Sequence, residues 1–112
     1  MKNSDIGKIG ENMATQFLEG KGYTIRERNF RCKAGEVDII ATKDSLISFV
    51  EVKTRQNFNY GRPCEAVTYN KQQRIIQCAQ YYLKALEWSG IRHVNVRFDV
   101  IEIVIRHTES AF

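Results

Sequence analysis

Residues 35–55, GEVDIIATKDSLISFVEVKTR, decide how this chain of 112 residues folds. Two runs rich in Val and Ile flank the polar turn TKDS, which is the pattern of an antiparallel β-hairpin. Asp38 interrupts the first run, and Glu51 and Lys53 interrupt the end of the second. Because an unpaired charge is costly to bury, these three side chains indicate a functional site at one edge of the sheet.

The pattern on either side of the hairpin predicts an α/β domain with the element order αβββαβ. We expect a helix, three strands, a second helix and a last strand over residues 5–21, 23–31, 36–42, 46–54, 69–88 and 95–105. Ser4 or Asp5 can cap the first helix and Gly22 can end it. Thr68 can cap the second helix, which Gly90 stops.

The last three elements predict how the sheet is assembled. A strand, a helix and a strand in succession favour a right-handed crossover, so the last strand should lie parallel to the third. Residues 46–54 are then internal, and the second helix should pack on the sheet through Ile76, Ala79 and Leu83. The length suits one domain over residues 1–112, with a mixed sheet and helices against it.

Composition excludes few function classes. The net charge of +4 and the pI of about 9.1 permit a polyanionic partner without requiring one. No apolar run could span a membrane and the N-terminus lacks the apolar centre of a signal peptide, so we expect a cytoplasmic protein with no membrane partner. Cys32, Cys64 and Cys78 lack Cys-x-x-Cys spacing, and we interpret them as reduced thiols.

The three charged residues of the hairpin form a pattern with a chemical meaning. Glu51 and Lys53 are two apart on one strand and face the same way, and Asp38 comes from the matching end of its neighbour. Two carboxylates beside a lysine suit a Mg²⁺-dependent phosphodiesterase, in which the lysine orients the attacking water. The alternative is a plain salt bridge between Glu51 and Lys53.

Two helical residues also break the local pattern. Glu11 lies on the flank of the apolar stripe of the first helix, at the border of the core. Gln72 falls by angular position in the middle of the stripe of the second helix, with Lys71 at its edge, and a core-facing glutamine needs partners. Alternatively, Glu11 only favours the helix N-terminus, and Gln72 only bonds a backbone group.

Four segments carry a resemblance to a known family: GENMATQFLEGKGYTIRERNFRCKAGEVDIIA, SFVEVKTR, AVTYNKQQRIIQCAQYYL and RFDVIEI. They resemble the YraN family of small bacterial proteins, which are predicted endonucleases. The VDIIA and FVEVK segments also resemble the D…(D/E)-x-K pattern of the restriction-endonuclease-like, or PD-(D/E)XK, superfamily, although no proline precedes Asp38. The αβββαβ order is similar to that of the superfamily core, and archaeal Holliday-junction resolvases are a similar branch.

The resemblance implies roles for individual residues. Asp38 and Glu51 would bind Mg²⁺ or Mn²⁺, and Lys53 would be the catalytic lysine. Glu11 would be a further acidic ligand, direct or through water, and Gln72, or Lys71 beside it, a polar residue supplied by the second helix. The substrate would be DNA, branched or damaged, and by analogy with the resolvases the enzyme would be a homodimer.

The long connection after the third strand suggests how a nucleic acid would be held. Arg55, Phe58, Tyr60 and Arg62 alternate basic and aromatic groups there, which suits backbone phosphates and unpaired bases, and Lys71 could add a phosphate contact. A solvated loop is the alternative. Three functions compete: a metal-dependent nuclease, a non-catalytic nucleic-acid-binding module with the same fold, and an adaptor that uses the sheet edge.

Overall fold

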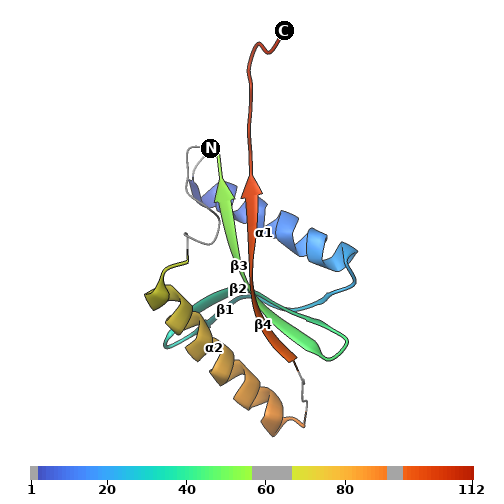
Figure 1. Ribbon diagram of the computed structural model, residues 1–112, viewed down its shortest axis with the longest axis vertical. Helices are drawn as coiled ribbons and strands as arrows, with labels where there is room; N and C mark the ends of the chain where they lie inside the picture. Colours follow the sequence, from blue (N-terminus) through green and yellow to red (C-terminus); the bar gives the residue numbers. More distant parts are fainter. Residues whose placement is uncertain (1–2, 57–66, 91–94) are drawn as a thin grey trace.

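A computed structural model describes residues 3–56, 67–90 and 95–112 (Figure 1). The elements are α1 Asn3–Gly20, β1 Thr24–Cys32, β2 Gly35–Lys43, β3 Leu46–Arg55, α2 Tyr69–Trp88 and β4 Asn95–Val104. The predicted α/β class and the order αβββαβ are therefore confirmed. No helix in the described ranges has an apolar stretch long enough to cross a bilayer.

The four strands form one mixed sheet in the order β1-β2-β3-β4. β1 and β2 pair antiparallel, as do β2 and β3, whereas β4 runs parallel to β3. The parallel pairing extends from Leu46 opposite Asn95 to Arg55 opposite Val104. The predictions of an internal third strand and of parallel pairing with the last strand are both confirmed.

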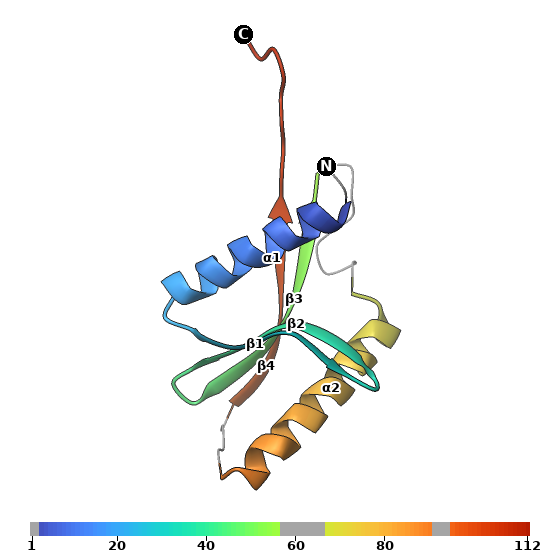
Figure 2. The same cartoon turned by 180° about the vertical axis from the view of Figure 1, so that it is seen from behind.

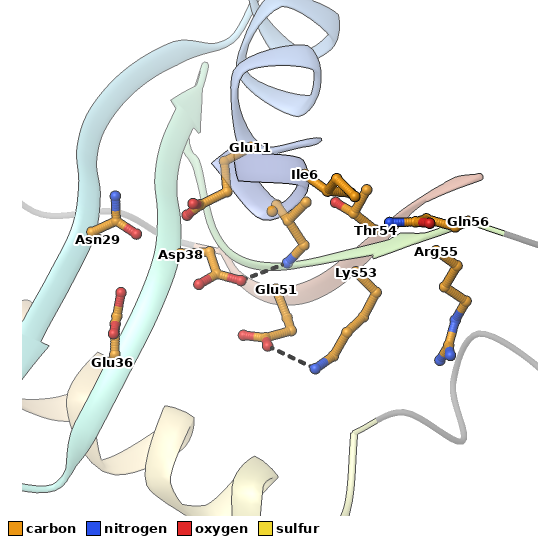
Figure 3. Close-up of a pocket in the computed structure, with 12 residues that line it drawn as sticks. Ile6, Glu11, Asn29, Glu36, Asp38, Glu51, Lys53, Thr54, Arg55 and Gln56 are labelled. Atoms are coloured by element: carbon orange, nitrogen blue, oxygen red, sulfur yellow. Dashed lines mark hydrogen bonds and ion pairs between the residues drawn. The ribbon is translucent and has the colours of Figure 1, made fainter. Parts of the chain in front are cut away.

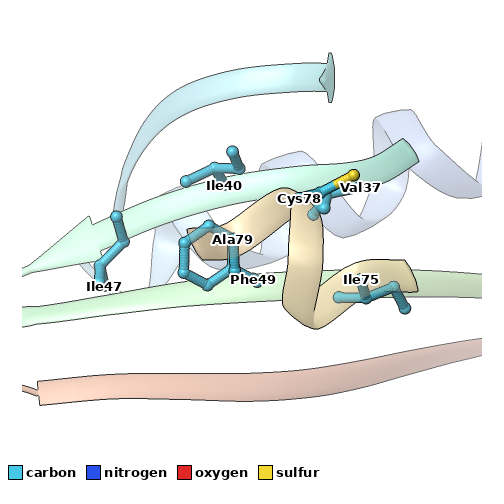
Figure 4. Close-up of a cluster of buried hydrophobic side chains, with 7 residues drawn as sticks. All are labelled: Val37, Ile40, Ile47, Phe49, Ile75, Cys78 and Ala79. Carbon is cyan, nitrogen blue, oxygen red and sulfur yellow. The ribbon is translucent and has the colours of Figure 1, made fainter. Parts of the chain in front are cut away.

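The helices cover opposite faces of the sheet (Figures 1 and 2). Successive residues of β3 serve the two faces in turn, as expected for an extended strand. Val50 packs with Ala14 and Leu18 of α1, whereas Ile47 and Phe49 pack under α2. The core on the α2 side is shown in Figure 4, and its buried members are Val37, Ile40, Ile47, Phe49, Ile75, Cys78 and Ala79.

The predicted contact face of α2 is partly wrong. Ala79 is buried and Leu83 packs against the core as expected, but Ile75 and Cys78 take the central place assigned to Ile76. Ile76 is only partly buried and borders β4 through a cavity. The helix is thus rotated slightly from the orientation that its apolar stripe alone suggests.

The helix ends mostly follow the predicted chemistry. The N–H groups of Gly22 and Tyr23 donate to the carbonyls of Glu19 and Leu18, which closes α1 in a Schellman motif. Gly22 has a φ of 93°, which explains a glycine there. The Thr68 hydroxyl accepts from the Lys71 N–H and caps α2. The expected cap at Ser4 or Asp5 is wrong, because α1 already begins at Asn3.

The sheet divides near its middle, and this division positions the site. β2 and β3 pair from Lys43 with Leu46 up to Ile39 with Val50. Beyond that point β2 pairs only with β1, and β3 pairs only with β4. Figure 2 shows the β1–β2 hairpin bending toward α2 while β3 and β4 continue together. We call this divergence the fork; Asp38 and Glu51 are the first residues beyond the last β2–β3 pair.

Candidate active site

The fork opens into a pocket of about 610 Å³ (Figure 3). Its lining includes Glu11 from α1, Asp38 from β2, and Glu51 and Lys53 from β3. Three elements thus bring together the four charged side chains on which the sequence interpretation depended. Glu36 of β2 also lines the pocket and pairs with Arg31 at 3.4 Å.

Asp38 stabilises the fork itself. Its Oδ2 accepts a hydrogen bond of 2.7 Å from the Val52 N–H, a donor that a regular ladder would direct at a β2 carbonyl. Burial, together with the charges of Glu51 and Glu11, raises the pKa of Asp38 to about 7, and the hydrogen bond from the Val52 N–H opposes this rise. Asp38 is therefore a carboxylate whose negative charge is unfavourable unless a cation is close.

Glu51 is the most buried acid of the pocket, with 6% of its surface exposed. Its Oε1 lies 3.5 Å from Lys53 Nζ and 2.5 Å from Lys71 Nζ, so two ammonium groups compensate one carboxylate. The proximity of Lys71, together with burial, lowers the pKa of Lys53. Burial also lowers the pKa of Lys71, but its contacts with Glu51 and Lys53 outweigh this and raise it overall. Lys71 thus belongs to the site through Glu51.

Glu11 faces the fork from α1, and its neighbours explain its electrostatics. Burial raises the pKa of Glu11, Arg28 opposes this, and the charges of Glu36 and Glu51 add to the rise. Like Asp38, Glu11 is a carboxylate that other acids disfavour in its charged form.

Asn29 is a site residue that the sequence interpretation missed. It falls opposite Asp38 in the β1–β2 register, with a φ of 53°. With its amide turned to face these acceptors, its side-chain nitrogen donates to Glu11 Oε1 at 2.7 Å and to Glu36 Oε1 at 3.0 Å. Asparagine tolerates positive φ better than most residues, but a strand pattern alone gives no sign of such a position.

Gly10 allows α1 to approach the end of β3 closely. A Cβ at Gly10 would lie 1.7 Å from Thr54 Oγ1. The Thr54 hydroxyl is buried without a hydrogen-bond partner in the described part of the chain. This contact holds the next residue, Glu11, over the pocket.

The interpretation of Gln72 as a core-facing glutamine is wrong. Gln72 is exposed, and its Nε2 donates to the Val67 carbonyl at 3.0 Å, so it satisfies a backbone group at the start of α2. Burial in α2 begins only at Ile75. Gln72 nevertheless lines a second cavity that it shares with Glu51.

The residues predicted to bind nucleic acid have separate outcomes. Arg55 lines the pocket, and its Nε lies 2.6 Å from Glu102 Oε1. Arg62, with Phe58 and Tyr60, lies outside the described residues. Asp99, on the last strand, pairs with Arg97 at 2.6 Å.

The donor set suits a hard divalent cation. As placed, no three His, Cys, Asp or Glu side chains in the described ranges are grouped closely enough to hold an ion. Asp38 and Glu51 interact directly across the fork, since the charge of Glu51 and a side-chain hydrogen bond with it both raise the pKa of Asp38. Mg²⁺ commonly binds through one or two carboxylates and keeps its remaining waters. A pair of acids at the fork fits that habit.

Comparisons with known proteins agree on one family. The model of "Uncharacterised protein family UPF0102" matches residues 10–103. A UPF0102 protein of Clostridium perfringens strain 13 is 50% identical over 101 residues, covering 90% of this chain and 80% of that protein. One from Alkaliphilus metalliredigens is 47% identical over 103 residues (92% and 88%), and one from Clostridium botulinum strain Loch Maree is 46% identical over 112 residues (98% and 88%).

Proposed function

The chain belongs to the UPF0102 family, and we propose that it is a metal-dependent endonuclease that hydrolyses phosphodiester bonds in DNA. One observation carries the proposal: the fork gathers Asp38, Glu51 and Lys53 around one pocket, with Glu11 beside them. A structural salt bridge would explain Glu51 and Lys53 but gives no reason for two more acids with raised pKa values. The resemblance to PD-(D/E)XK nucleases supports the same roles.

In this proposal Asp38 and Glu51 hold Mg²⁺ or Mn²⁺, and Glu11 assists directly or through a water. When bound, the ion makes a water more acidic and neutralises charge that develops on the phosphate. Lys53 orients the attacking water and adds positive charge where negative charge grows. The raised pKa of Asp38 fits this role, because a carboxylate that is costly to charge alone gains most from a cation.

Lys71 gains a role from its contact with Glu51. Its ammonium group contacts Glu51 Oε1, so a divalent cation held by the Glu51 carboxylate would compete with Lys71. Released from Glu51, Lys71 is a cation at the edge of the site, where a DNA phosphate would replace the lost partner. Arg55 and Arg62 are proposed to hold neighbouring phosphates.

A non-catalytic nucleic-acid-binding module is the second candidate. The observation in its favour is the double compensation of Glu51 by Lys53 and Lys71, which leaves this carboxylate satisfied without any metal. In that case the basic groups around the fork would bind phosphates, and the acids would only position them.

A cleavage screen tests the two candidates. The protein is incubated with end-labelled linear, flapped and four-way DNA in Mg²⁺ or Mn²⁺, beside Asp38→Asn and Glu51→Gln. We expect cleavage of at least one structure by the wild type and none by either variant. Glu19→Gln, an exposed acid on α1, is the control and should cleave normally. Salt-sensitive binding without cleavage in either metal would favour the binding module.

A further inference from the structure

A second cavity, of about 250 Å³, adjoins the fork on the α2 side of the sheet. That volume is below the roughly 300–1,000 Å³ typical of pockets for drug-sized ligands, and so suits a single ring system. Its polar lining residues are Glu51, Gln72 and Asp99. Its apolar lining comes from Phe49, Val67, Ile75, Ile76, Phe98 and Val100.

The wall formed by β4 is unusually apolar for a surface. Phe98 is 48% exposed and Val100 is 40% exposed, although β4 is the last strand of the sheet. The Phe98 ring stacks on Phe49, with centroids 5.6 Å apart and an interplanar angle of 26°. Phe49 is fully buried, so it fixes the orientation of the exposed ring. A rigid aromatic surface of this kind can receive a flat partner.

Glu51 connects this cavity to the candidate active site, because it lines both. Lys71 contacts Glu51 from α2, and Lys53 contacts it from β3. A phosphate held by Lys71 would therefore lie at the entrance of the cavity. The group joined to that phosphate through one sugar would be within reach of the Phe98 wall.

A nucleobase matches what the cavity offers. Its faces are apolar and stack on aromatic rings, and its edge carries hydrogen-bonding groups. Among the polar lining residues, Gln72 donates its Nε2–H to the Val67 carbonyl, which leaves its Oε1 as an acceptor. One amide acceptor and a stacking wall bind a base without reading its identity. A base inside a duplex is stacked and paired, so only an unpaired base can enter.

We propose that this cavity, with Phe98 as its stacking wall, binds one unpaired nucleobase of the DNA strand held at the fork. The inference rests on the proposed nucleic-acid substrate and narrows it to DNA with a single-stranded segment beside the bound phosphate, such as a flap or overhang. It does not require that the strand is cut.

The test is an abasic scan by binding alone. A series of fluorescent DNAs carries a single-stranded overhang with one abasic residue, which lies one nucleotide further along in each member of the series. The affinity of the protein for each DNA is measured in EDTA and in Ca²⁺, which replaces Mg²⁺. We expect the abasic residue to weaken binding at one position, by roughly five- to 150-fold, which is the range for loss of one stacked base. All four bases at that position should bind similarly.

Two variants locate the effect. Phe98→Ala should bind base-containing DNA as weakly as abasic DNA, and Ile76→Trp, which fills the cavity, should do the same. Tyr81→Ala removes an exposed aromatic ring of α2 that does not line the cavity. This variant should therefore bind base-containing DNA more tightly than abasic DNA, as the wild type does. Circular dichroism and melting curves establish that each variant is folded.

The outcomes separate this inference from the proposed function. Wild-type protein that binds every abasic DNA as well as its parent would overturn the base site, whether or not it cleaves. Equal losses in Phe98→Ala and Tyr81→Ala would also overturn it. Self-association abolished by Phe98→Ala, without base dependence, would assign the wall to a second copy instead. Tighter binding of base-containing than of abasic DNA, without cleavage in Mg²⁺ or Mn²⁺, would support the base site and count against the nuclease.

Discussion

Lys53 and Lys71 approach the same carboxylate oxygen from different elements, and their removal should have different effects. Lys53→Ala removes no metal ligand, so DNA binding and metal binding should persist. The Lys53 ammonium group acts on the transition state. Without it, the single-turnover cleavage rate at saturating protein should drop about 10²- to 10³-fold, which corresponds to an activation free energy higher by about 2.7 to 4 kcal/mol. Lys84→Ala, an exposed lysine of α2, is the matched control. Wild-type cleavage by Lys53→Ala would remove this lysine from the mechanism.

Asp38 should make the metal-free protein less stable as the pH rises. Its pKa is 3.8 in the unfolded chain and about 7 in the folded one, so the folded state binds more protons in that window. The free energy of unfolding should therefore fall between pH 3.8 and about 7. Urea unfolding in EDTA at several pH values measures this slope. Asp38→Asn, which can still accept from Val52, should flatten it; an unchanged slope would assign the effect to other acids.

The charged pattern of the hairpin was enough to predict which residues of β2 and β3 meet. Strand alternation puts Glu51 and Lys53 on one face, and this needs no knowledge of the rest of the chain. Asn29 was not predicted as a site residue, because its position depends on a positive φ and on a register shift between Ile25 and Glu27 in β1. Gln72 was wrongly assigned to the core, because a helical wheel assumes that the first turn of α2 is buried like the later turns, whereas burial begins at Ile75.

At the scale of elements, the contact between α1 and β3 depends on Gly10. Gly10→Ala would place a methyl group 1.7 Å from Thr54 Oγ1 and 2.9 Å from its Cβ, so α1 must shift. We expect a loss of about 1–3 kcal/mol in the free energy of unfolding, as for other overpacked sites. Urea denaturation measures it.

Gly7→Ala is the matched control for Gly10→Ala on the same helix. Apart from its own helix backbone, no atom of the described residues lies within 4 Å of a Cβ at Gly7. Only helix propensity then changes, and stability should rise by up to about 1 kcal/mol. The double variant Gly10→Ala/Thr54→Ala removes the clashing hydroxyl and should recover part of the loss. Equal changes in the free energy of unfolding for Gly7→Ala and Gly10→Ala would show that α1 does not pack closely on β3 at Gly10.

The element order was predictable because each segment has a clear period and clear stop signals. Parallel pairing of β4 with β3 followed from the crossover rule, without any contact information. The fork was not predictable, because it results from a side chain replacing a main-chain partner. Asp38 takes the Val52 N–H, and a sequence pattern counts Asp38 simply as one more strand residue.

At the scale of the whole molecule, a divalent cation should stabilise the fold. Ligand binding to the native state alone adds about 2.7 kcal/mol at 100 times the dissociation constant. The melting temperature should rise in Mg²⁺ or Mn²⁺ for the wild type and not for Asp38→Asn. Lys71→Ala should show the rise at lower ion concentration, since Lys71 competes for Glu51. An equal rise in the wild type and in Asp38→Asn would place the ion elsewhere.

The shape of the molecule bears on the expected homodimer. The radius of gyration is 15.6 Å, against about 13 Å for a compact chain of this length. Figure 1 shows β4 continuing into an extended C-terminal segment that projects beyond the sheet. An elongated protomer exposes more surface than a compact one, and a symmetric partner would cover part of it. Sedimentation equilibrium should give twice the chain mass of 13.0 kDa; the mass of one chain would contradict the homodimer.

The parallel pairing of β3 with β4 also sets an order of events on the ribosome. Leu46 pairs with Asn95, and Arg55 pairs with Val104, each 49 positions later in the chain. At roughly 5–20 residues per second, about 2 to 10 seconds separate the synthesis of the two strands. The nascent chain therefore carries Glu11, Asp38, Glu51 and Lys53 before the strand that pairs with β3 exists. Newly made protein should therefore acquire its site only after β4 has been synthesised and has paired with β3.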